Sequence, residues 1–512
     1  MKHPLIFFTT AIIFSYFLFL QKKSNAQNGN LDISFGNGGK VTTTIGTIDK
    51  AWSIAIQSDS KIVLGGYTYN GINYDFALVR YNTNGTLDNS FGNGGIVTTD
   101  IDSSEYGYSV AIQSDGKIVL AGSIVNQDFA LVRYHTDGTL DNTFGNGGKV
   151  ISNIAGTSGQ GNSIVIQNDG KIVLTGFIHN INDDDMVLIR YNSDGTLDNS
   201  FGNGGIQTTD IAGGNDAAYS VALQTDGKIV ICGSVGGASN PLAVLRYNTN
   251  GTLDNSFGNG GIQTTVCGTR AVGFSVAIQN DGKIVVGAMT WTTFINNDFA
   301  LLRYNANGTL DNSFGNGGIT VMLNDSLDYC RSLAIQNNGK ILLGGRSKTA
   351  TNFDFRIDCY NTNGTLDNSF GNAGTVLTDI SDYDSGLSLA TQSDGKIVLA
   401  GSSSVGNVSY FALARYIFTE DPEGLSTIPN QNLQIKTYPN PFTTKTTFQV
   451  NTMLHDATLI IHDNKGQQLK QLQHLYGKEI ILYRNHLPTG FYTMQLIQNN
   501  KIIAKGTFVI GQ

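Results

Sequence analysis

The chain has 512 residues, of which 40% are hydrophobic and only 14% are charged, and it contains 62 glycines but 7 prolines. This is enough apolar material for a large core, and the many glycines are typical of an all-β protein rich in turns. The formal net charge of −8 and the lack of any Lys/Arg-rich run argue against a nucleic-acid partner.

Residues 1–26 are predicted to be a secretory signal peptide. Lys2 precedes an apolar run from Leu5 to Leu20, and Ser24-Asn25-Ala26 supplies small residues for cleavage before Gln27. A membrane anchor is the competing interpretation, but the apolar run is short for a spanning helix. We therefore expect the mature chain to contain no integral membrane segment.

One short sequence then recurs seven times. Each copy consists of Leu-Asp followed by Phe-Gly-Asn-Gly-Gly, with Ala in place of one Gly in the last copy. The copies begin at Leu31, Leu87, Leu140, Leu197, Leu253, Leu310 and Leu366. The spacing of 53 to 57 residues indicates an array of similar supersecondary units.

Each unit is predicted to contain four short strands, here called a, b, c and d. In the unit around residue 110 they are Tyr108–Gln113, Lys117–Gly122, Phe129–Tyr134 and Gly147–Ile151. Turns containing Asp-Gly separate a from b and c from d. Four strands in a unit of this length are typical of a β-propeller blade, so the sequence predicts an all-β, seven-bladed propeller.

The two ends of the array predict how the ring closes. The chain enters at Asn28 within a c–d turn, so its first strand, from Gly39 to Ile45, is a d strand. It leaves after Tyr416, which ends a c strand, so the last blade lacks its own d strand. We expect the N-terminal strand to complete the last blade and to remove an exposed sheet edge.

Three motifs in every unit resemble the delta-60 repeat. They are Ala-x-Gln-x-Asp-Gly-Lys-Ile-Val-x-Ala-Gly, Phe-Ala-Leu-x-Arg-Tyr-Asn and Leu-Asp-x-Ser-Phe-Gly. The resemblance implies a propeller over residues 27–418. It also implies a bacterial surface or secreted protein, although this repeat family has no well-defined biochemical role.

A second domain is expected at residues 433–512, after a linker at 419–432 that contains Asp421-Pro422-Glu423-Gly424 and Pro429. Its alternating segments predict a small β-sandwich. These segments are Thr446–Val450, Ala457–Asp463, Glu479–Leu482, Phe491–Ile497 and Ile502–Ile510.

Several landmarks of this domain resemble the C-terminal sorting domain of the type IX secretion system of Bacteroidetes. They are Tyr438-Pro439-Asn440-Pro441-Phe442, the turn Asp463-Asn464-Lys465-Gly466, Leu487-Pro488-Thr489-Gly490-Phe491-Tyr492, and a last strand with Lys505. Gln467 stands where lysine is common. The resemblance implies that the export machinery binds this domain, and that the chain is then released or attached to the cell surface.

The repeated polar residues are predicted to be structural. A lysine occupies one position in all seven units, and an arginine occupies another in six, with Cys359 replacing it in the sixth. Because catalysis needs one asymmetric constellation, we expect hydrogen-bond and ion-pair networks within each blade. The Phe-Gly-Asn-Gly-Gly segment is expected to be a turn, since a strand follows it where a phosphate loop needs a helix.

No catalytic or metal centre is evident. His135 and His179 are the only propeller histidines and occupy non-equivalent positions, and no cluster has metal-ligand spacing. The acidic run Asp183–Asp185 is expected to be solvated. The Asn/Asp-Gly-Thr-Leu-Asp segment lacks the closing Glu of an EF-hand, so calcium has no support. We expect a monomer with no catalytic residue, metal or cofactor, and not an enzyme.

The four cysteines, Cys232, Cys267, Cys330 and Cys359, are not part of the repeat. An exported chain allows disulfides. Cys232 could pair with Cys267, and Cys330 with Cys359, but the sequence does not decide this.

Ligand binding is predicted on the face formed by the b–c and d–a connections, because these segments differ from unit to unit. Aromatic residues there suit sugars or exposed peptide. They are Trp52, Tyr67, Tyr69, Tyr74, Tyr106, Phe177, Trp291, Phe294, Phe353, Tyr383 and Tyr410. Acidic residues precede strand c in five units, with an expected capping role: Asp75, Asp128, Asp185, Asp298 and Asp354.

These features predict an exported propeller that acts as a binding or adhesion module for a glycan or a surface protein. The alternatives are a propeller-fold enzyme acting on polysaccharide, either a lyase or a glycosidase, and a passive structural surface protein. A cluster of two carboxylates, or of His with Tyr or Arg, near the axis of the variable face would favour the enzyme.

Overall fold

The computed structural model describes residues 27–419 and 435–511, except 126–128, 155–157, 212, 238–239, 294–295, 324–325, 351, 464–467 and 499–500. The predicted signal peptide, nearly all of the predicted linker and most of the turn at 463–466 lie outside these residues. The chain divides into two compact units, with the boundary between Phe418 and Thr419. No helix among the described residues is long and apolar enough to cross a membrane.

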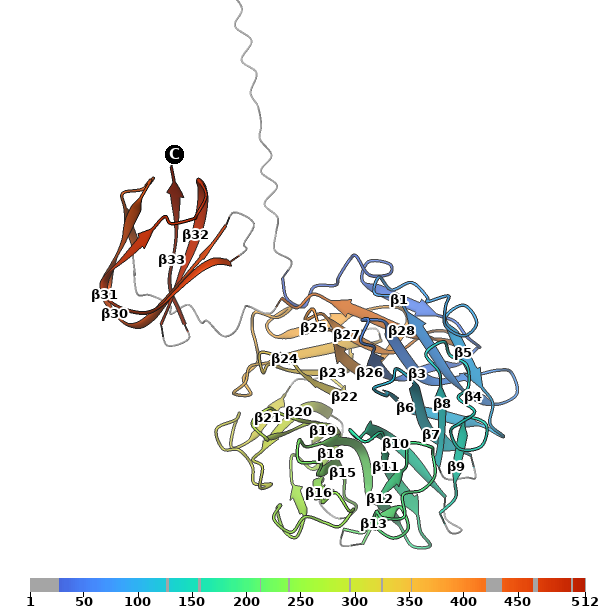
Figure 1. Ribbon diagram of the computed structural model, residues 1–512. Helices are drawn as coiled ribbons and strands as arrows, with labels where there is room; N and C mark the ends of the chain where they lie inside the picture. Colours follow the sequence, from blue (N-terminus) through green and yellow to red (C-terminus); the bar gives the residue numbers. More distant parts are fainter. Residues whose placement is uncertain are drawn as a thin grey trace, which may run out of the picture. The chain divides into compact units, whose positions relative to one another are not determined.

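The first unit is a seven-bladed β-propeller, as predicted, with four antiparallel strands in each blade (Figure 1). The a strands surround the axis. They are β2 (Asp49–Ile56), β6 (Glu105–Ile112), β10 (Ser158–Ile166), β14 (Ala217–Leu223), β18 (Arg270–Ile278), β22 (Asp328–Ile335) and β26 (Tyr383–Thr391).

The b strands follow through tight turns. They are β3 (Ile62–Tyr69), β7 (Ile118–Ile124), β11 (Ile172–His179), β15 (Ile229–Ser234), β19 (Ile284–Thr293), β23 (Ile341–Lys348) and β27 (Ile397–Val405). The c strands are β4 (Tyr74–Tyr81), β8 (Phe129–Tyr134), β12 (Asp184–Tyr191), β16 (Leu242–Tyr247), β20 (Asn296–Tyr304), β24 (Phe353–Tyr360) and β28 (Val408–Tyr416). The short outer d strands are β5 (Ile96–Thr99), β9 (Lys149–Ser152), β13 (Ile206–Thr209), β17 (Ile262–Thr265), β21 (Ile319–Met322), β25 (Thr375–Thr378) and β1 (Lys40–Thr43).

The predicted ring closure is confirmed. β1 pairs antiparallel with β28, so the first strand of the fold is the outer strand of the last blade. The interrupted turn keeps its hydrogen bonds, because the N–H of Ile417 donates to Asn30 and the N–H of Gly29 donates to Ile417. The same two bonds occur in the uninterrupted turn of the first blade, at Asn82 and Gly85.

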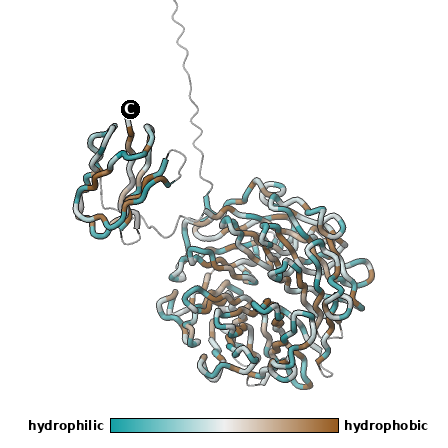
Figure 2. Tube along the Cα trace, viewed as in Figure 1, coloured by the Kyte–Doolittle hydropathy of each residue, from teal (hydrophilic) through white to brown (hydrophobic). Residues whose placement is uncertain are grey.

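Apolar side chains fill the spaces between blades. Figure 2 shows hydrophobic segments within the blades and hydrophilic ones mainly at the turns. Every junction between neighbouring blades has its own buried cluster. The cluster that joins the last blade to the first includes Phe35, Leu64 and Phe411, each with no exposed surface. A single sheet cannot cover both of its apolar faces, so the blades depend on their neighbours.

A ring of serine hydrogen bonds lies near the axis. In each a strand a β-bulge precedes a serine, and the serine hydroxyl accepts the backbone N–H of a residue in the neighbouring a strand. In the first blade Ser53 accepts from Val110 at 3.1 Å, and Ser388 of the last blade accepts from Ile54 of the first at 3.2 Å. The other acceptors are Ser109, Ser163, Ser220, Ser275 and Ser332.

The conformation of the repeated glycine turn explains why alanine can replace glycine at one position of one copy. Gly92, Gly94 and Gly95 all have positive φ, from 52° to 97°. A Cβ at Gly92 or Gly95 would approach Ile96 or Leu87 to 3.0 Å or less, whereas at Gly94 the nearest atom is 4.0 Å away. The sixth unit places Ala373 at the position of Gly94, with φ 51°, where a side chain has space.

The second unit is a small β-domain of five strands: β29 (Ile435–Tyr438), β30 (Lys445–His462), β31 (Gln468–Tyr483), β32 (Gly490–Gln498) and β33 (Lys501–Ile510). The long strand β30 pairs with β29, β31 and β32, so hydrogen bonds link all five strands. The segments predicted at 446–450 and 457–463 belong to the single long strand β30. Breaks in its register with β31, after Gln449 and Leu454, bend the sheet around one core.

Candidate ligand-binding site

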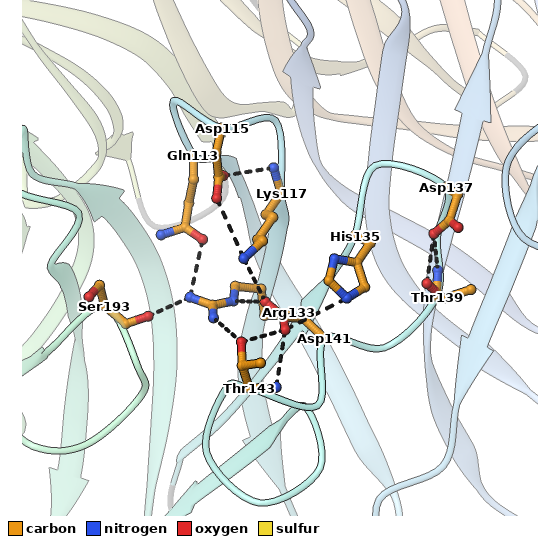
Figure 3. Close-up of polar contacts among 10 residues, drawn as sticks. All are labelled: Gln113, Asp115, Lys117, Arg133, His135, Asp137, Thr139, Asp141, Thr143 and Ser193. Atoms are coloured by element: carbon orange, nitrogen blue, oxygen red, sulfur yellow. Dashed lines mark hydrogen bonds and ion pairs between the residues drawn. The ribbon is translucent and has the colours of Figure 1, made fainter.

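The a–b and c–d turns lie at one end of the blades, here called the turn face, and the b–c and d–a connections at the other, here called the variable face. On the turn face, Figure 3 shows the polar network of the second blade. Asp141, fully buried, accepts from Arg133 Nε at 2.8 Å and from the Thr143 hydroxyl at 2.6 Å. Lys117 Nζ lies 3.1 Å from the same carboxylate.

The network also joins neighbouring blades, which the sequence did not predict. Arg133 Nη1 donates to the carbonyl of Ser193 in the third blade, and its guanidinium lies 4.5 Å from the Phe144 ring centroid. Arg415 of the last blade likewise donates to Thr83 of the first. The repeated arginine, lysine and aspartate are therefore structural groups, as predicted, that act both within and between blades.

The lowered pKa values of these aspartates predict that acid destabilises the propeller. Burial alone would raise the pKa of Asp141, but the Thr143 hydroxyl, Lys117 and Arg133 hold it well below its usual range. The same direction holds in the other six units. A lowered pKa stabilises the fold above the unfolded value near pH ~4, and that contribution is lost as pH falls further. We expect the melting temperature to fall steeply below about pH 4; a flat profile between pH 3 and 7 would contradict this.

On the variable face, the structure brings four of the predicted aromatic residues together. Tyr67, Tyr69 and Tyr74 of the first blade meet Tyr106 of the second, with centroid separations of 4.9 to 5.4 Å. Trp52 lies nearby at the bulge of β2 and packs edge-on against Tyr108. These rings form one surface across two blades.

The other predicted aromatic residues are more scattered. Phe177 packs against His179, and Trp291 lies under Arg270 at 4.9 Å. Phe353 and Tyr383 pack together at 5.2 Å. Tyr410 lies in β28, and Phe294 lies outside the described residues. The placement of these residues in loops was wrong for those described, which lie in strands because the a, b and c strands extend far toward the variable face.

The sequence analysis missed an arginine that organises a second aromatic group. Arg346 of β23 lies over the rings of Tyr329, Phe353 and Tyr383, at 4.4, 5.0 and 5.4 Å. Its Nη1 donates to the Ser385 hydroxyl in the last blade at 3.1 Å. Its buried Nε has no hydrogen-bond partner among the described residues. An arginine stacked on several rings offers its in-plane N–H groups to a ligand.

Two further cations lie near Arg346 and were also missed. Burial lowers the pKa of Arg331 and of Lys50, and the positive charge of Arg346 lowers both further. Arg331 lies over the Phe274 ring at 4.2 Å. Lys50, Tyr329 and Ser385 occupy the same register position in the a strands of blades one, six and seven. The small Ser385 therefore separates Lys50 from Arg346. We call Lys50, Tyr329, Arg331, Arg346, Phe353 and Tyr383 the axial cluster.

Within the described part of the chain, these three cations form no ion pair with an acidic side chain. Other lysines and arginines of the propeller do form such pairs. A half-buried positive charge without a counter-ion is unfavourable in the free protein. An anionic group bound at the axial cluster would relieve this cost. One signal could have found the site: the residue just before the repeated serine takes six different identities in the seven units, from Trp52 to Arg331, inside an otherwise repeated strand.

All four cysteines are free and buried, so neither of the disulfides left open by the sequence is present. Burial raises the pKa of Cys232 and Cys330. In the sixth blade Cys359 stands where the other blades have arginine; among the described residues Lys340 is the one cation that pairs with Asp367, at 2.7 Å, and the Cys359 thiol donates to the same carboxylate at 3.8 Å. The thiols are packing groups rather than cross-links.

In the second unit, the predicted sorting residues gather around the last strand. Asn440 Oδ1 accepts the N–H of Val509 at 2.7 Å, and Pro439 accepts from the Thr446 hydroxyl. Tyr492 stacks on Phe508 at 5.3 Å and donates to Pro488. Gly490 pairs with Ile510, and Lys505 pairs with Gln495. Tyr438 remains 81% exposed and Pro441 is also exposed, so both are accessible to a partner.

Two family matches cover the two units. Seven segments match the family described as a domain of unknown function (DUF5122) beta-propeller, at residues 57–91, 113–144, 167–201, 224–257, 279–314, 336–370 and 392–416. Residues 436–510 match the secretion system C-terminal sorting domain. No curated protein matches the chain.

Solved structures with similar folds share little sequence. The extracellular domain of the hybrid two component system BT3049 from B. thetaiotaomicron is 12% identical, with a TM-score of 0.39, over 93% of this chain and 57% of that one. A PL25 ulvan lyase is 12% identical, with a TM-score of 0.44, over 74% and 96%. Drosophila Semaphorin 2a is 8% identical, with a TM-score of 0.45, over 95% and 98%. The chain thus spans little more than half of the first structure.

Proposed function

Because the chain belongs to the DUF5122 β-propeller repeat proteins and carries a type IX sorting domain, we propose that it is an exported binding module for an acidic glycan. The sorting domain indicates export to the cell surface or secretion through the type IX machinery. The predicted signal peptide at residues 1–26 would provide the first step, across the inner membrane. The axial cluster supports the second half of the proposal, the binding of an acidic glycan.

One observation carries the proposal: Arg331, Arg346 and Lys50 gather beside aromatic rings at the axis without an acidic partner among the described residues. Carboxylate or sulfate groups bind arginine through charge-assisted hydrogen bonds. Sugar rings pack on aromatic faces, which lose little conformational entropy on binding. A polysaccharide carrying uronic acid or sulfate groups satisfies both requirements. A neutral glycan satisfies only the second.

The test compares binding of the full-length mature chain to acidic and neutral oligosaccharides of matched length by calorimetry. We expect binding to the acidic series only, and Arg346→Ala should weaken it about 10- to 100-fold, the loss typical of a hydrogen bond to a charged group. The matched control is Arg270→Ala, which removes a guanidinium that stacks on Trp291 alone. Equal binding of neutral glycans, or unchanged affinity in Arg346→Ala, would contradict the proposal.

A specific feature also favours the enzymatic alternative, a lyase. Tyr329 lies directly under Arg346, so an arginine and a tyrosine meet near the axis of the variable face. A lyase needs a cation to neutralise the uronate carboxylate and a base to remove the neighbouring proton. Appearance of unsaturated products in the same binding mixtures, and their loss in Tyr329→Phe with binding retained, would identify a lyase.

A further inference from the structure

Three blade junctions each contain three carboxylates. They come from the start of strand c, the residue after strand d and the start of the next strand a. The triads are Asp75, Asp100 and Glu105; Asp185, Asp210 and Asp216; and Asp354, Asp379 and Asp384. In the first and third triads, one oxygen from each residue lies within 4.8 Å of the other two. The second triad is not gathered as closely, but it occupies the same three register positions, and the buried Oδ1 of Asp185 has no hydrogen-bond partner among the described residues.

Buried oxygens in these triads lack partners. Glu105 has no exposed surface; one of its oxygens accepts the N–H of Asp102 at 2.9 Å, but Oε2 has no hydrogen bond among the described residues. Asp354 is 8% exposed, and its Oδ1 is likewise without a partner there. A buried carboxylate oxygen normally has a hydrogen-bond or cation partner. These two oxygens therefore point to a missing ligand.

Positive charge is also absent from the triads. Within the described residues, no lysine, arginine or histidine forms an ion pair with any of the nine carboxylates, although ion pairs are present in every blade. Lys149 and Lys40 lie close but donate to the backbone carbonyls of Asp100 and Asp379. Burial raises the pKa of Glu105 to about 7, with Asp100 and Asp75 adding to the effect.

The distribution of the third carboxylate among the units supports a ligand. Asp100, Asp210 and Asp379 occur only at junctions that also carry both other carboxylates. The four remaining junctions have Thr44, Asn153, Val266 and Leu323 at this position. Where Asp298 and Asp328 occur without a third carboxylate, Arg356 pairs with Asp328 instead. Like charges repel at this range. A third carboxylate beside two others therefore destabilises the fold unless a bound cation offsets the repulsion.

We propose that each triad binds one calcium ion between adjacent blades. Calcium takes oxygen ligands at about 2.3–2.6 Å, so two oxygens on opposite sides of one ion lie no more than about 5 Å apart, as the oxygens of the first and third triads do. In each triad, a polar side chain five residues before the first carboxylate lies beside that carboxylate. Asn70 donates to both oxygens of Asp75 at 3.0 and 2.9 Å, and Asn180 donates to Asp185. Thr349 is the equivalent residue in the third triad, where it lowers the pKa of Asp354, although burial and the neighbouring carboxylates raise that pKa overall.

The triads lie next to aromatic residues of the variable face, so bound ions would stabilise that face. Glu105 directly precedes Tyr106, and Asp384 directly follows Tyr383. Calcium at these junctions would hold the c strand of one blade against the a strand of the next, beside the aromatic surface and the axial cluster. The acidic run at Asp183–Asp185, expected to be solvated, would contribute Asp185 to the second ion site.

The test uses the full-length mature chain, stripped of metal with a chelator and titrated with calcium alone by equilibrium dialysis. We expect three ions per chain. The substitutions Asp100→Asn, Asp210→Asn and Asp379→Asn should each remove one of them, and because all three side chains are exposed, the fold should persist. Asp382→Asn removes an exposed carboxylate beside the third triad and is the matched control, with three ions retained.

Thermal unfolding provides a second measurement. Calcium should raise the melting temperature of the wild-type chain and of Asp382→Asn by mass action, and it should leave that of the triple Asp→Asn variant unchanged. Absence of calcium binding at millimolar concentration would overturn the proposal. So would three ions bound by the triple variant, or an equal rise in its melting temperature.

Discussion

Deleting residues 27–44 is expected to abolish cooperative unfolding of the propeller. The deletion removes β1 and leaves the edge of β28 without a partner. It also removes Phe35, which is fully buried, and Asp32, which pairs with the buried Arg415 at 2.8 Å. Loss of a buried Phe side chain costs about 3–5 kcal/mol and an unpaired buried cation costs a similar amount. Together these exceed the lower end of the ~5–15 kcal/mol that stabilises a typical protein.

A circular permutant is the matched control for this deletion. Residues 47–417, 27–46 and 418–512, joined in that order, connect Ile417 directly to Gln27. The new turn then has the length of the turn from Tyr81 to Leu87 in the first blade. We expect this permutant to unfold cooperatively, since it keeps β1 beside β28, at a melting temperature lowered by the loss of the buried Phe418 from its place against Phe370. Unchanged melting of the truncated chain, measured by calorimetry, would show that closure does not stabilise the ring.

The substitution Asp141→Asn is expected to destabilise the propeller by about 3–5 kcal/mol, the cost of breaking a buried ion pair. Arg133, 5% exposed, would lose the only carboxylate that it pairs with among the described residues. The hydrogen bond from Arg133 to the Ser193 carbonyl in the next blade would then be made by a buried guanidinium without a counter-ion. A lower midpoint of denaturant unfolding, at an unchanged slope, would measure the effect.

Two comparisons separate this effect from a general loss of charge. Asp115→Asn removes an exposed partner of Lys117, 3.6 Å away, and should cost no more than about 1 kcal/mol. Arg133→Cys copies the sixth blade, where Cys359 replaces the arginine and Lys340 is the one cation that pairs with Asp367 among the described residues. We expect Arg133→Cys to cost less than Asp141→Asn, because Asp141 would keep Lys117 and Thr143. The reverse order would contradict the assigned role of Arg133.

The propeller, its seven blades and its closure follow from the amino-acid sequence alone. Strand alternation and Asp-Gly turns are local signals, and seven copies of them reinforce one another. The phase of the array, which starts with a d strand and stops after a c strand, is enough to predict that β1 completes the last blade. The sorting landmarks, such as Asn440 and Tyr492, were readable for the same reason, because each is a short local motif.

The set of groups that meet at the axis could not be predicted from the sequence, because it depends on the tertiary structure. Lys50 and Arg346 are almost three hundred residues apart, and ring closure brings the first and sixth blades to either side of Ser385. The carboxylate triads likewise draw on three strands of two blades. Repeat periodicity describes what the units share, whereas these sites consist of residues that differ between units. Their assembly depends on register and on closure, which act between units rather than within one.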